Sequence, residues 1–499
     1  MNLPQDWHGE LYGTDVVEWF MLVETLGWVI SSLALDDHGS NSSAVILGLK
    51  YKWCGSHESG RLECLFIFFC DLHRIRFAAH ISAPSLDPKS DNMAPLQIAI
   101  IGSGLSGLSL ALALHQQNIP CTIYESRPAP LNIGGAVMLS PNALKILDAL
   151  GIYERVRAKG YNFETLEYKN GSGELLEVYE FGSKEKYGYK ALRIYRTVLI
   201  DEFLAMLKER DINIVFGKKF TKVVAETEKD VTWEFQDGSI QSADILVGAD
   251  GIHSTVRRYL YPDLVPAFTG MAGVTAAVPT KQLKIPTGYH IPVTIITPNG
   301  GFVIAPQEVD GSEVLIGKQK RMGEGFDRAG WERYTADKAS LVEFLQEGAE
   351  NFPEMVQNAV SQIPHDKINV WPFYVVPKLE NWASEKRHVV ILGDAAHAIP
   401  PSAGQGINQA FEDVYMFALL LGQADKVGMQ DALSFWQEYR QKRIAKVMWL
   451  NRQTDLRRMP KEARMPGETI EEIELSWLYL PNFKDDVESW ISGKLEKSN

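Results

Sequence analysis

Three glycines in the spacing Gly-x-Gly-x-x-Gly stand at positions 102, 104 and 107, between an apolar run (97–101) and a helical pattern (108–117). This spacing permits a tight turn, close approach of the backbone to a pyrophosphate, and close packing of the helix on the strand. The start of the helix adds free N–H groups and the positive end of its dipole. We therefore expect a dinucleotide's phosphates to bind at Gly102, Ser103, Gly104 and Gly107. The alternative is a tight turn that holds no ligand.

An acidic residue follows at the end of the next expected strand, 121–125, which is Glu125. A carboxylate at this point of a βαβ unit can accept hydrogen bonds from the hydroxyls of a ribose. The same carboxylate repels a 2′-phosphate. The loop should therefore hold FAD or NAD rather than NADP.

Asp250 and Gly251 stand at the end of a second apolar strand, in ILVGADG. An Asp-Gly pair is also common in ordinary turns after a strand. Taken alone, this pair does not decide between a ligand site and a turn.

A second glycine-rich stretch, GDAAHAIPPSAGQGINQAFED, follows a third apolar strand (388–392). Asp394 should lie at the carboxyl end of that strand, where α/β sheets bind their ligands. Gly404 and Gly406 let the backbone approach a ligand. The helix that begins near Ile407 and Asn408 would present positive potential to a developing anion. The alternative is a glycine-rich helix cap with a purely structural role.

The bulk composition excludes several classes of protein. The chain has 499 residues, 45% hydrophobic and 23% charged, which is typical of two or three globular domains. A net charge of −13 argues against nucleic acid as a partner. Four cysteines form no disulfide framework, so we expect a reducing compartment and a cytoplasmic location.

Residues 1–92 differ in composition from the rest of the chain. They hold three of the four cysteines. The apolar run 16–35 contains Glu18 and Glu24, and no basic residue precedes it, which argues against a membrane span or a signal peptide. We expect no metal site, because the spacing of Cys54, His57, Cys64 and Cys70 fits no standard ligand pattern. Two interpretations stay open: an extension without function, or a segment absent from the natural mature chain.

The expected elements alternate in a way that predicts an α/β fold. Residues 97–125 form a βαβ unit. The helix after Leu139 has Ser140 as its N-cap, Pro141 at its first position and Gly151 at its end. Further along, we expect a helix at 195–210, a three-stranded meander over 218–251, antiparallel hairpins and a helix within 265–380, and helices from Gly406 onward.

The three motifs, in this order and spacing, resemble the FAD-dependent aromatic hydroxylases, such as para-hydroxybenzoate and salicylate hydroxylases. The resemblance runs from about Leu96 to Met448 and leaves out residues 1–92. It implies a Rossmann-like FAD-binding domain, an inserted antiparallel-sheet substrate domain and a helical C-terminus. It also implies FAD as cofactor, and NADPH or NADH as electron donor.

The resemblance assigns roles to individual residues. The first three glycines would cradle the FAD pyrophosphate, and Glu125 would hold the adenosine ribose. Asp250 and Gly251 match a motif associated with both FAD and NAD(P)H. Asp394 would bind the ribityl chain. The remaining matches would lie beside the flavin or reach it: Gly135, Ala136, Arg196, Gly404, Gly406, Ile407 and Asn408.

The implied domain boundaries follow the change in strand pattern. The FAD-binding domain would comprise residues 93–264 and 381–450. The substrate domain would comprise 265–380, with a hairpin contributed from about 165–190. Residues 451–499 would form a C-terminal tail.

The resemblance implies a monooxygenase that uses NAD(P)H and O2 to hydroxylate a phenolic or aromatic small molecule. Three alternatives stay open: epoxidation of an olefinic metabolite, a flavin reductase or halogenase on the same fold, and a flavin-binding protein with a regulatory role. The halogenase motif Trp-x-Trp-x-Ile-Pro is absent, and the nearest text is VWPFYVVP. A homodimer is a further expectation.

No catalytic acid or base stands out in the sequence. Tyr289 and His290 could orient or deprotonate a phenol, although an ordinary packing role is the stronger interpretation for each. We expect His397 to be structural. We expect Arg257 and Arg258 to be solvated, or to steer the phosphates of the nicotinamide cofactor.

Overall fold

The computed structural model describes residues 66–67, 78–79, 96–130, 135–298, 300–458 and 464–498. The chain divides into two units, Met1–Met93 and Ala94–Asn499. In the first unit, strands β1 (Phe66–Ile67) and β2 (Ala78–Ala79) pair antiparallel. The sequence predictions for the run 16–35 and for Cys54, His57, Cys64 and Cys70 lie outside the described residues.

A five-stranded parallel sheet forms the centre of the nucleotide-binding half. Three of its strands, β3 (Ile98–Ile101), β14 (Ile245–Gly248) and β20 (Val389–Ile391), are buried along their whole length, which is typical of a parallel sheet covered by helices. The order across the sheet is β10 (Asn213–Val215), β4 (Cys121–Tyr124), β3 (Ile98–Ile101), β14 (Ile245–Gly248) and β20 (Val389–Ile391). This sheet confirms the α/β prediction.

Helices cover this sheet and share its hydrophobic core. The principal ones are α2 (Leu105–Gln116), α3 (Pro141–Ala149), α6 (Arg196–Glu209) and α13 (Gly406–Leu421). The predicted cap of α3 is wrong in one detail. Ser140 occupies the N-cap position, but its hydroxyl donates to Asn142 Oδ1 instead of bonding the helix backbone.

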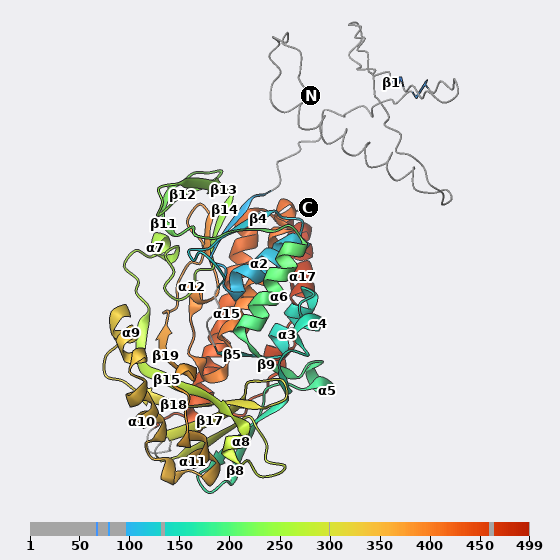
Figure 1. Cartoon of the computed structure of the whole chain (residues 1–499). Helices are drawn as coiled ribbons and strands as arrows, with labels where there is room; N and C mark the ends of the chain where they lie inside the picture. Colours follow the sequence, from blue (N-terminus) through green and yellow to red (C-terminus); the bar gives the residue numbers. More distant parts are fainter. Residues whose placement is uncertain are drawn as a thin grey trace, which may run out of the picture. The chain divides into compact units, whose positions relative to one another are not determined.

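The predicted meander is present as a separate three-stranded sheet. Its strands are β11 (Phe220–Glu226), β12 (Val231–Phe235) and β13 (Ile240–Ala243). Trp233 and Phe235 are buried in the same core as the parallel sheet. The meander therefore closes one end of the nucleotide-binding half (Figure 1).

A seven-stranded sheet forms the other end of the unit (Figure 1). All of its neighbouring strands run antiparallel except β16 and β7, which are parallel. The order is β19 (Ile368–Val375), β15 (Ala267–Pro279), β18 (Glu313–Arg321), β17 (Gly300–Pro306), β16 (Val293–Thr297), β7 (Thr165–Asn170) and β8 (Leu175–Glu180). Helices α8 (Thr280–Leu283), α10 (Lys338–Gln346) and α11 (Glu354–Ser361) pack on one face and enclose a second core. The predicted antiparallel sheet is therefore confirmed.

A small sheet joins the two halves. Strand β9 (Ala191–Tyr195) lies between β5 (Ala136–Leu139) and β6 (Tyr161–Phe163), antiparallel to both. Leu192 and Ile194 point into the core of the parallel sheet. The opposite face of the small sheet looks onto a third cluster, which we call the aromatic core. Its buried members are Phe163, Leu166, Tyr168, Tyr179, Phe181, Tyr187, Ala191, Ala403, Val447, Leu450, Leu475, Leu478 and Tyr479.

The C-terminal part is helical, as predicted, with α14 (Ala424–Val427), α15 (Met429–Arg458), α16 (Ser476–Tyr479) and α17 (Phe483–Ser498). The predicted boundary at 450 falls inside α15, and Leu478 and Tyr479 are buried in the aromatic core. The domain boundaries themselves stay a prediction. Among the helices that the structure describes, none combines the length and apolar character that a membrane crossing requires.

Candidate cofactor site

The parallel sheet brings the three sequence motifs to one edge. In register, Ile101 on β3 pairs with Tyr124 on β4 and with Gly248 on β14, and Gly248 pairs with Ile391 on β20. The residues that follow these strands are Gly102, Glu125, Asp250 and Asp394. Because parallel strands end at the same edge, segments far apart in sequence meet where α/β sheets bind their ligands.

The three glycines of the first motif have three different physical roles. Gly102 has φ +107°, and a Cβ there would lie 2.6 Å from Ala249 O. A Cβ on Gly107 would lie 2.0 Å from Gly102 O, so this glycine lets α2 approach the turn. A Cβ on Gly104, at the start of α2, would meet no atom within 4 Å. Gly104 therefore faces open space at a helix N-terminus, where a phosphate could approach.

Glu125 is buried and fixed by the residues around it. One carboxylate oxygen accepts hydrogen bonds from Ser103 N (3.0 Å) and Ser103 Oγ (2.8 Å). The other accepts bonds from Arg127 N (2.9 Å) and Ser126 Oγ (3.0 Å). Burial opposes ionisation, but the hydrogen bonds from Arg127 and Ser103 outweigh it and lower the pKa of Glu125. The residue therefore carries a fixed negative charge beside the first loop.

Asp250 has one satisfied oxygen and one without a partner. Oδ2 accepts hydrogen bonds from Thr255 N (2.7 Å) and Val256 N (3.2 Å), whereas the buried Oδ1 has no partner among the described residues. Burial raises the pKa of Asp250. Gly251 beside it has φ +78° and faces open space. A buried polar atom left unpaired is costly unless a ligand or water supplies the missing bond.

Arg257 corrects one sequence prediction. It is neither solvated nor free to steer a cofactor, because only 2% of it is exposed. Its guanidinium donates to Ala395 O (2.9 Å) and Ile252 O (2.6 Å), and so ties the second motif to the third. Arg258 is exposed, as expected.

The third motif places Asp394 at the start of the short helix α12 (Asp394–His397), after Gly393 at φ +58°. Desolvation by the surrounding protein raises the pKa of Asp394, and the positive charges of His397 and Arg196 act in the opposite direction. Arg196 is the first residue of α6, and its buried Nε has no hydrogen-bond partner in the part of the chain that the structure describes. Its guanidinium lies 5.5 Å from the ring centre of Trp371. The charges of Asp394 and Arg196 therefore interact with each other.

The loop before α13 is fastened to the small sheet through Asn408. Its Oδ1 accepts from Ser140 N (3.0 Å), and its Nδ2 donates to Met138 O (3.1 Å) and Gly404 O (2.7 Å). Gly404 has φ +64°, and a Cβ there would lie 3.0 Å from the ring of Phe181. Gly406, by contrast, faces open space at the start of a 16-residue helix.

The remaining predicted residues fall into two groups. Gly135 faces open space and accepts a bond from Arg196 N (3.3 Å), Ala136 pairs with Tyr195 on β9, and Ile407 packs on the core of the parallel sheet. Tyr289 packs instead on the second core, and His290 Nε2 lies 2.9 Å from Thr165 O. These positions favour packing roles for Tyr289 and His290.

A buried charge network holds the turn at Gly393. Asp413 on α13 is fully buried. It accepts bonds from Gly393 N (2.9 Å), from Arg440 Nε (2.8 Å) and from His397 Nε2. Burial works against the charge of Asp413, but His397 and Arg440 outweigh it and lower its pKa. This geometry supports the structural role expected for His397.

Replacing Asp413 with Asn should destabilise the protein by about 3 kcal/mol at pH 7, because Arg440 keeps only one of two buried carboxylate partners. A carboxyl whose pKa is lowered by folding stabilises the native state above its unfolded pKa. That contribution is lost as the pH falls through the folded pKa. In urea, the free energy of unfolding of the wild type should therefore exceed that of Asp413→Asn at pH 7. This difference should become smaller below about pH 4.

The control is Glu438→Gln, which removes a surface pair with Lys442. This change should alter stability by less than about 1 kcal/mol. A gap between wild type and Asp413→Asn that stayed constant down to the lowest pH would contradict the assignment.

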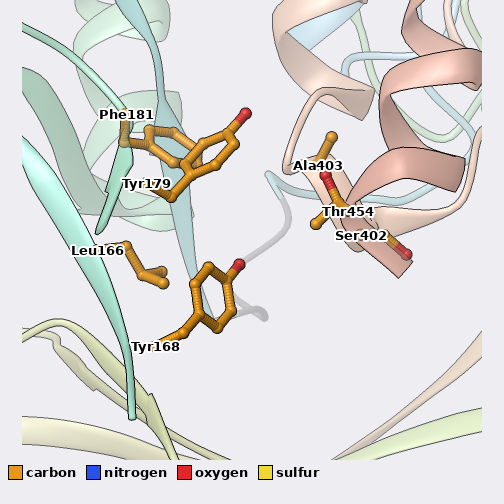
Figure 2. A pocket seen from close by; sticks show the side chains of 7 residues that line it. All are labelled: Leu166, Tyr168, Tyr179, Phe181, Ser402, Ala403 and Thr454. Carbon is orange, nitrogen blue, oxygen red and sulfur yellow. The ribbon is translucent and has the colours of Figure 1, made fainter. Parts of the chain in front are cut away.

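A small pocket lies between the seven-stranded sheet and the loop before α13 (Figure 2). Its cavity volume is about 20 Å³, and it is lined by Leu166, Tyr168, Tyr179, Phe181, Ser402, Ala403 and Thr454. In Figure 2 the aromatic side chains stand on one side, and Ser402, Ala403 and Thr454 on the other. The sequence analysis missed these residues. The alternating apolar positions 166 and 168 indicate a strand with one buried face. They do not indicate which part of the protein packs against that face.

The site can now be assigned to a class. Four glycines that face open space (Gly104, Gly135, Gly251 and Gly406), two helix N-termini, and unpaired polar atoms on Asp250 and Arg196 define an α/β protein that binds an extended dinucleotide.

The chain belongs to the family described as FAD binding domain, whose model matches residues 95–450, and within it to the FAD-dependent aromatic hydroxylases. It is an FAD-dependent monooxygenase. The residues present fit FAD, since each of the three motifs contains a glycine that faces open space: Gly104, Gly251 and Gly406.

Similar proteins agree with this assignment. The chain is 30% identical to a 3-amino-4-hydroxybenzoate 2-monooxygenase of Streptomyces platensis, over 70% of this chain and 85% of the relative. It is 27% identical to a salicylate hydroxylase of Pseudomonas putida, over 72% and 85%. A solved salicylate hydroxylase substrate complex has the same fold, with a TM-score of 0.65 and 21% identity over 80% of this chain and 98% of the other.

Proposed function

We propose that this enzyme uses NAD(P)H and O2 to hydroxylate a phenolic aromatic small molecule. The observation that carries the proposal is the pocket beside the loop before α13. Three of its lining side chains are aromatic, and Tyr168, Ser402 and Thr454 bring hydroxyls to it. Aromatic faces suit a flat ring, and hydroxyls can bind the oxygen of a phenol. The names of the relatives, which act on aminohydroxybenzoate and salicylate, support the same substrate class.

We assign the cofactor contacts as follows. Gly102, Ser103, Gly104 and Gly107 bind the pyrophosphate at the start of α2, and Glu125 accepts hydrogen bonds from the adenosine ribose. Asp394 binds the ribityl chain, with Asp250, Gly251 and Arg196 near it. Gly135, Ala136 and the segment Gly404–Asn408 lie along the redox ring.

When bound, FAD supplies storage of two electrons from NAD(P)H and the activation of O2. The protein supplies electrostatics and shape. The N-terminus of α13 stabilises the negative charge of the reduced ring, since its free N–H groups and dipole are directed at the loop. The aromatic core excludes water from the substrate side and holds the ring in place. A homodimer and a cytoplasmic location remain predictions.

The test is substrate-dependent consumption of NAD(P)H by the FAD-loaded enzyme. A panel of phenols should include at least one that stimulates NAD(P)H oxidation, with matching oxygen uptake and a product heavier by one oxygen atom. If no phenol stimulates either consumption, the proposal is wrong. Products formed from alkenes alone would favour epoxidation instead.

A substitution that fills the pocket gives a sharper result. Leu166→Trp should lower kcat/KM for an accepted phenol by roughly 100-fold, because a displaced ring loses its alignment with the reacting group. FAD content should stay normal, since Leu166 lies on β7 and not in a cofactor loop. FAD content must be measured in the same variant, because Ser402 and Ala403 of the loop before α13 line the same pocket. Leu175→Trp is the matched control: this leucine is 55% exposed on the neighbouring strand β8. Equal kcat/KM in both variants would show that the pocket does not bind the substrate.

A further inference from the structure

Arg193 is a buried charge that faces the substrate side of the protein. It lies in the middle of β9 and is 5% exposed. Met138 on β5 and Tyr161 on β6 are its direct cross-strand partners, so all three side chains share one face of the small sheet. Met138 and Tyr161 pack on the aromatic core, whose members line the pocket. Arg193 therefore points away from the cofactor-side core and toward the aromatic core.

The guanidinium of Arg193 has no carboxylate partner among the residues that the structure describes. Within the described part of the chain, its one hydrogen bond is from Nη2 to Gln307 Oε1 (2.5 Å), and its buried Nε has no partner. The described residues include two other fully buried arginines. Arg440 forms ion pairs with Glu412 and Asp413, and Arg257 is stabilised in its charged form by the nearby Asp250. In the described part of the chain, no carboxylate is paired with Arg193.

A buried guanidinium without an anion is unfavourable, and a protein rarely keeps one that serves only packing. Burial lowers the pKa of Arg193 to about 10, so it remains charged at neutral pH. Its planar donors match a carboxylate in two-point geometry. The missing partner is therefore an anionic group that is supplied from outside the chain.

We propose that Arg193, together with Gln307, binds the acid group of the aromatic substrate and so makes this enzyme selective for aromatic acids over neutral phenols. This inference rests on the proposed function and deepens it. Gln307 presents its Oε1 to Arg193 at the end of β17, and so holds the guanidinium beside the aromatic core. Arg193 acts as a specificity-determining residue and takes no part in the oxygen chemistry.

A structural explanation competes with this proposal. Gln307 Nε2 donates to the Tyr195 hydroxyl (3.4 Å), which in turn donates to Glu313. Through this chain Glu313 could compensate Arg193 at a distance. Glu313 is, however, already bonded by Tyr195 and paired with Lys367 at 3.4 Å. The two explanations differ in what happens when the charge of Arg193 is removed.

The experiment uses the FAD-loaded enzyme and a matched pair of probes, benzoate and its neutral amide, benzamide. Binding is measured by calorimetry and by the change in flavin absorbance. Wild type should bind benzoate at least about 30-fold more tightly than benzamide, as expected for a buried charge-assisted pair. Arg193→Met should bring this ratio close to one, and Arg193→Lys should retain part of it. Arg155→Met, which removes a surface arginine paired with Glu209, should leave the ratio unchanged.

Thermal unfolding separates the two explanations. If Arg193 is a binding group, Arg193→Met should melt at or above the wild-type temperature, because an unpaired buried charge has been removed. Arg440→Met should melt well below it, because two buried carboxylates lose their partner. Melting of Arg193→Met as low as that of Arg440→Met would overturn the proposal in favour of the structural role.

The remaining outcomes distinguish this proposal from the function on which it rests. Equal binding of benzoate and benzamide, with hydroxylation of neutral phenols, would refute the role of Arg193 and leave the hydroxylase intact. Binding of benzoate that depends on Arg193, without turnover of any phenol, would support the anion site and refute the hydroxylation. Absence of both binding and turnover would refute both.

Discussion

Asp394→Ala should yield a folded protein that purifies largely without FAD. The Asp394 carboxylate makes no hydrogen bond to any other residue that the structure describes, so its loss breaks no internal hydrogen bond. It does remove the acceptor that we assign to the ribityl hydroxyls. A charge-assisted hydrogen bond of this kind corresponds to roughly 10- to 100-fold in affinity. It also leaves Arg196 without the carboxylate that shares its environment.

The measurement is the ratio of flavin to protein absorbance after purification, together with the melting temperature of the apoprotein. Asp201→Ala is a suitable control, since Asp201 is an exposed aspartate on α6. It should retain FAD in full. Full occupancy in Asp394→Ala would show that this aspartate does not hold the cofactor.

Two alanine substitutions in the first glycine motif should have different effects, one on folding and the other on FAD binding. Gly107→Ala places a Cβ 2.0 Å from Gly102 O, a contact that neither α2 nor the turn can relieve by a side-chain movement. The expected cost is about 4 kcal/mol or more, so little folded protein should form. Gly104 has φ −73° and open space around it, so Gly104→Ala should fold with an unchanged melting temperature.

Gly104→Ala should still lose FAD affinity, because its methyl group occupies the space into which a pyrophosphate would approach. We expect more than about a tenfold loss, equivalent to one good hydrogen bond. Soluble yield, thermal unfolding and FAD titration measure the two effects separately. If Gly104→Ala bound FAD as tightly as wild type, the phosphates would lie elsewhere.

The sequence was sufficient for those parts of the site that are local. A Gly-x-Gly-x-x-Gly turn, a carboxylate after a strand and a glycine-rich helix start are each written within a short stretch. Parallel pairing then brings such strand ends to the same edge. This is why the positions of Gly102, Glu125, Asp250 and Asp394 could be anticipated without coordinates.

The substrate side could not be anticipated, because it depends on which face of each strand meets which neighbour. Tyr289 was a reasonable aromatic candidate by residue type, yet it packs on the second core. Tyr168 was indistinguishable from it in sequence, yet it lines the pocket. A two-residue period gives the alternation of a strand but not the partner of each face.

Buried charges raise the same difficulty. Asp413 and Arg440 lie on different helices. Arg193 lies on β9, whereas Gln307 directly follows β17 of another sheet. Nothing in the local sequence marks Arg257 as buried or Arg193 as lacking a counter-charge. Such facts arise only from packing between distant segments, which also explains why the prediction for Arg257 was wrong.

The position of β20 in the parallel sheet has a consequence for how the protein acquires its structure. This strand leads to Asp394 at the start of α12 and pairs with β14, but the whole run from β15 to β19 lies between the two strands in the chain. Such non-local pairing is slow, since the entropy of closing a long loop must be overcome before the contacts form. Until β20 arrives, β14 presents an apolar, unpaired edge, which is prone to aggregation. The yield of folded enzyme should therefore depend on synthesis temperature and chaperones more strongly than its final stability suggests.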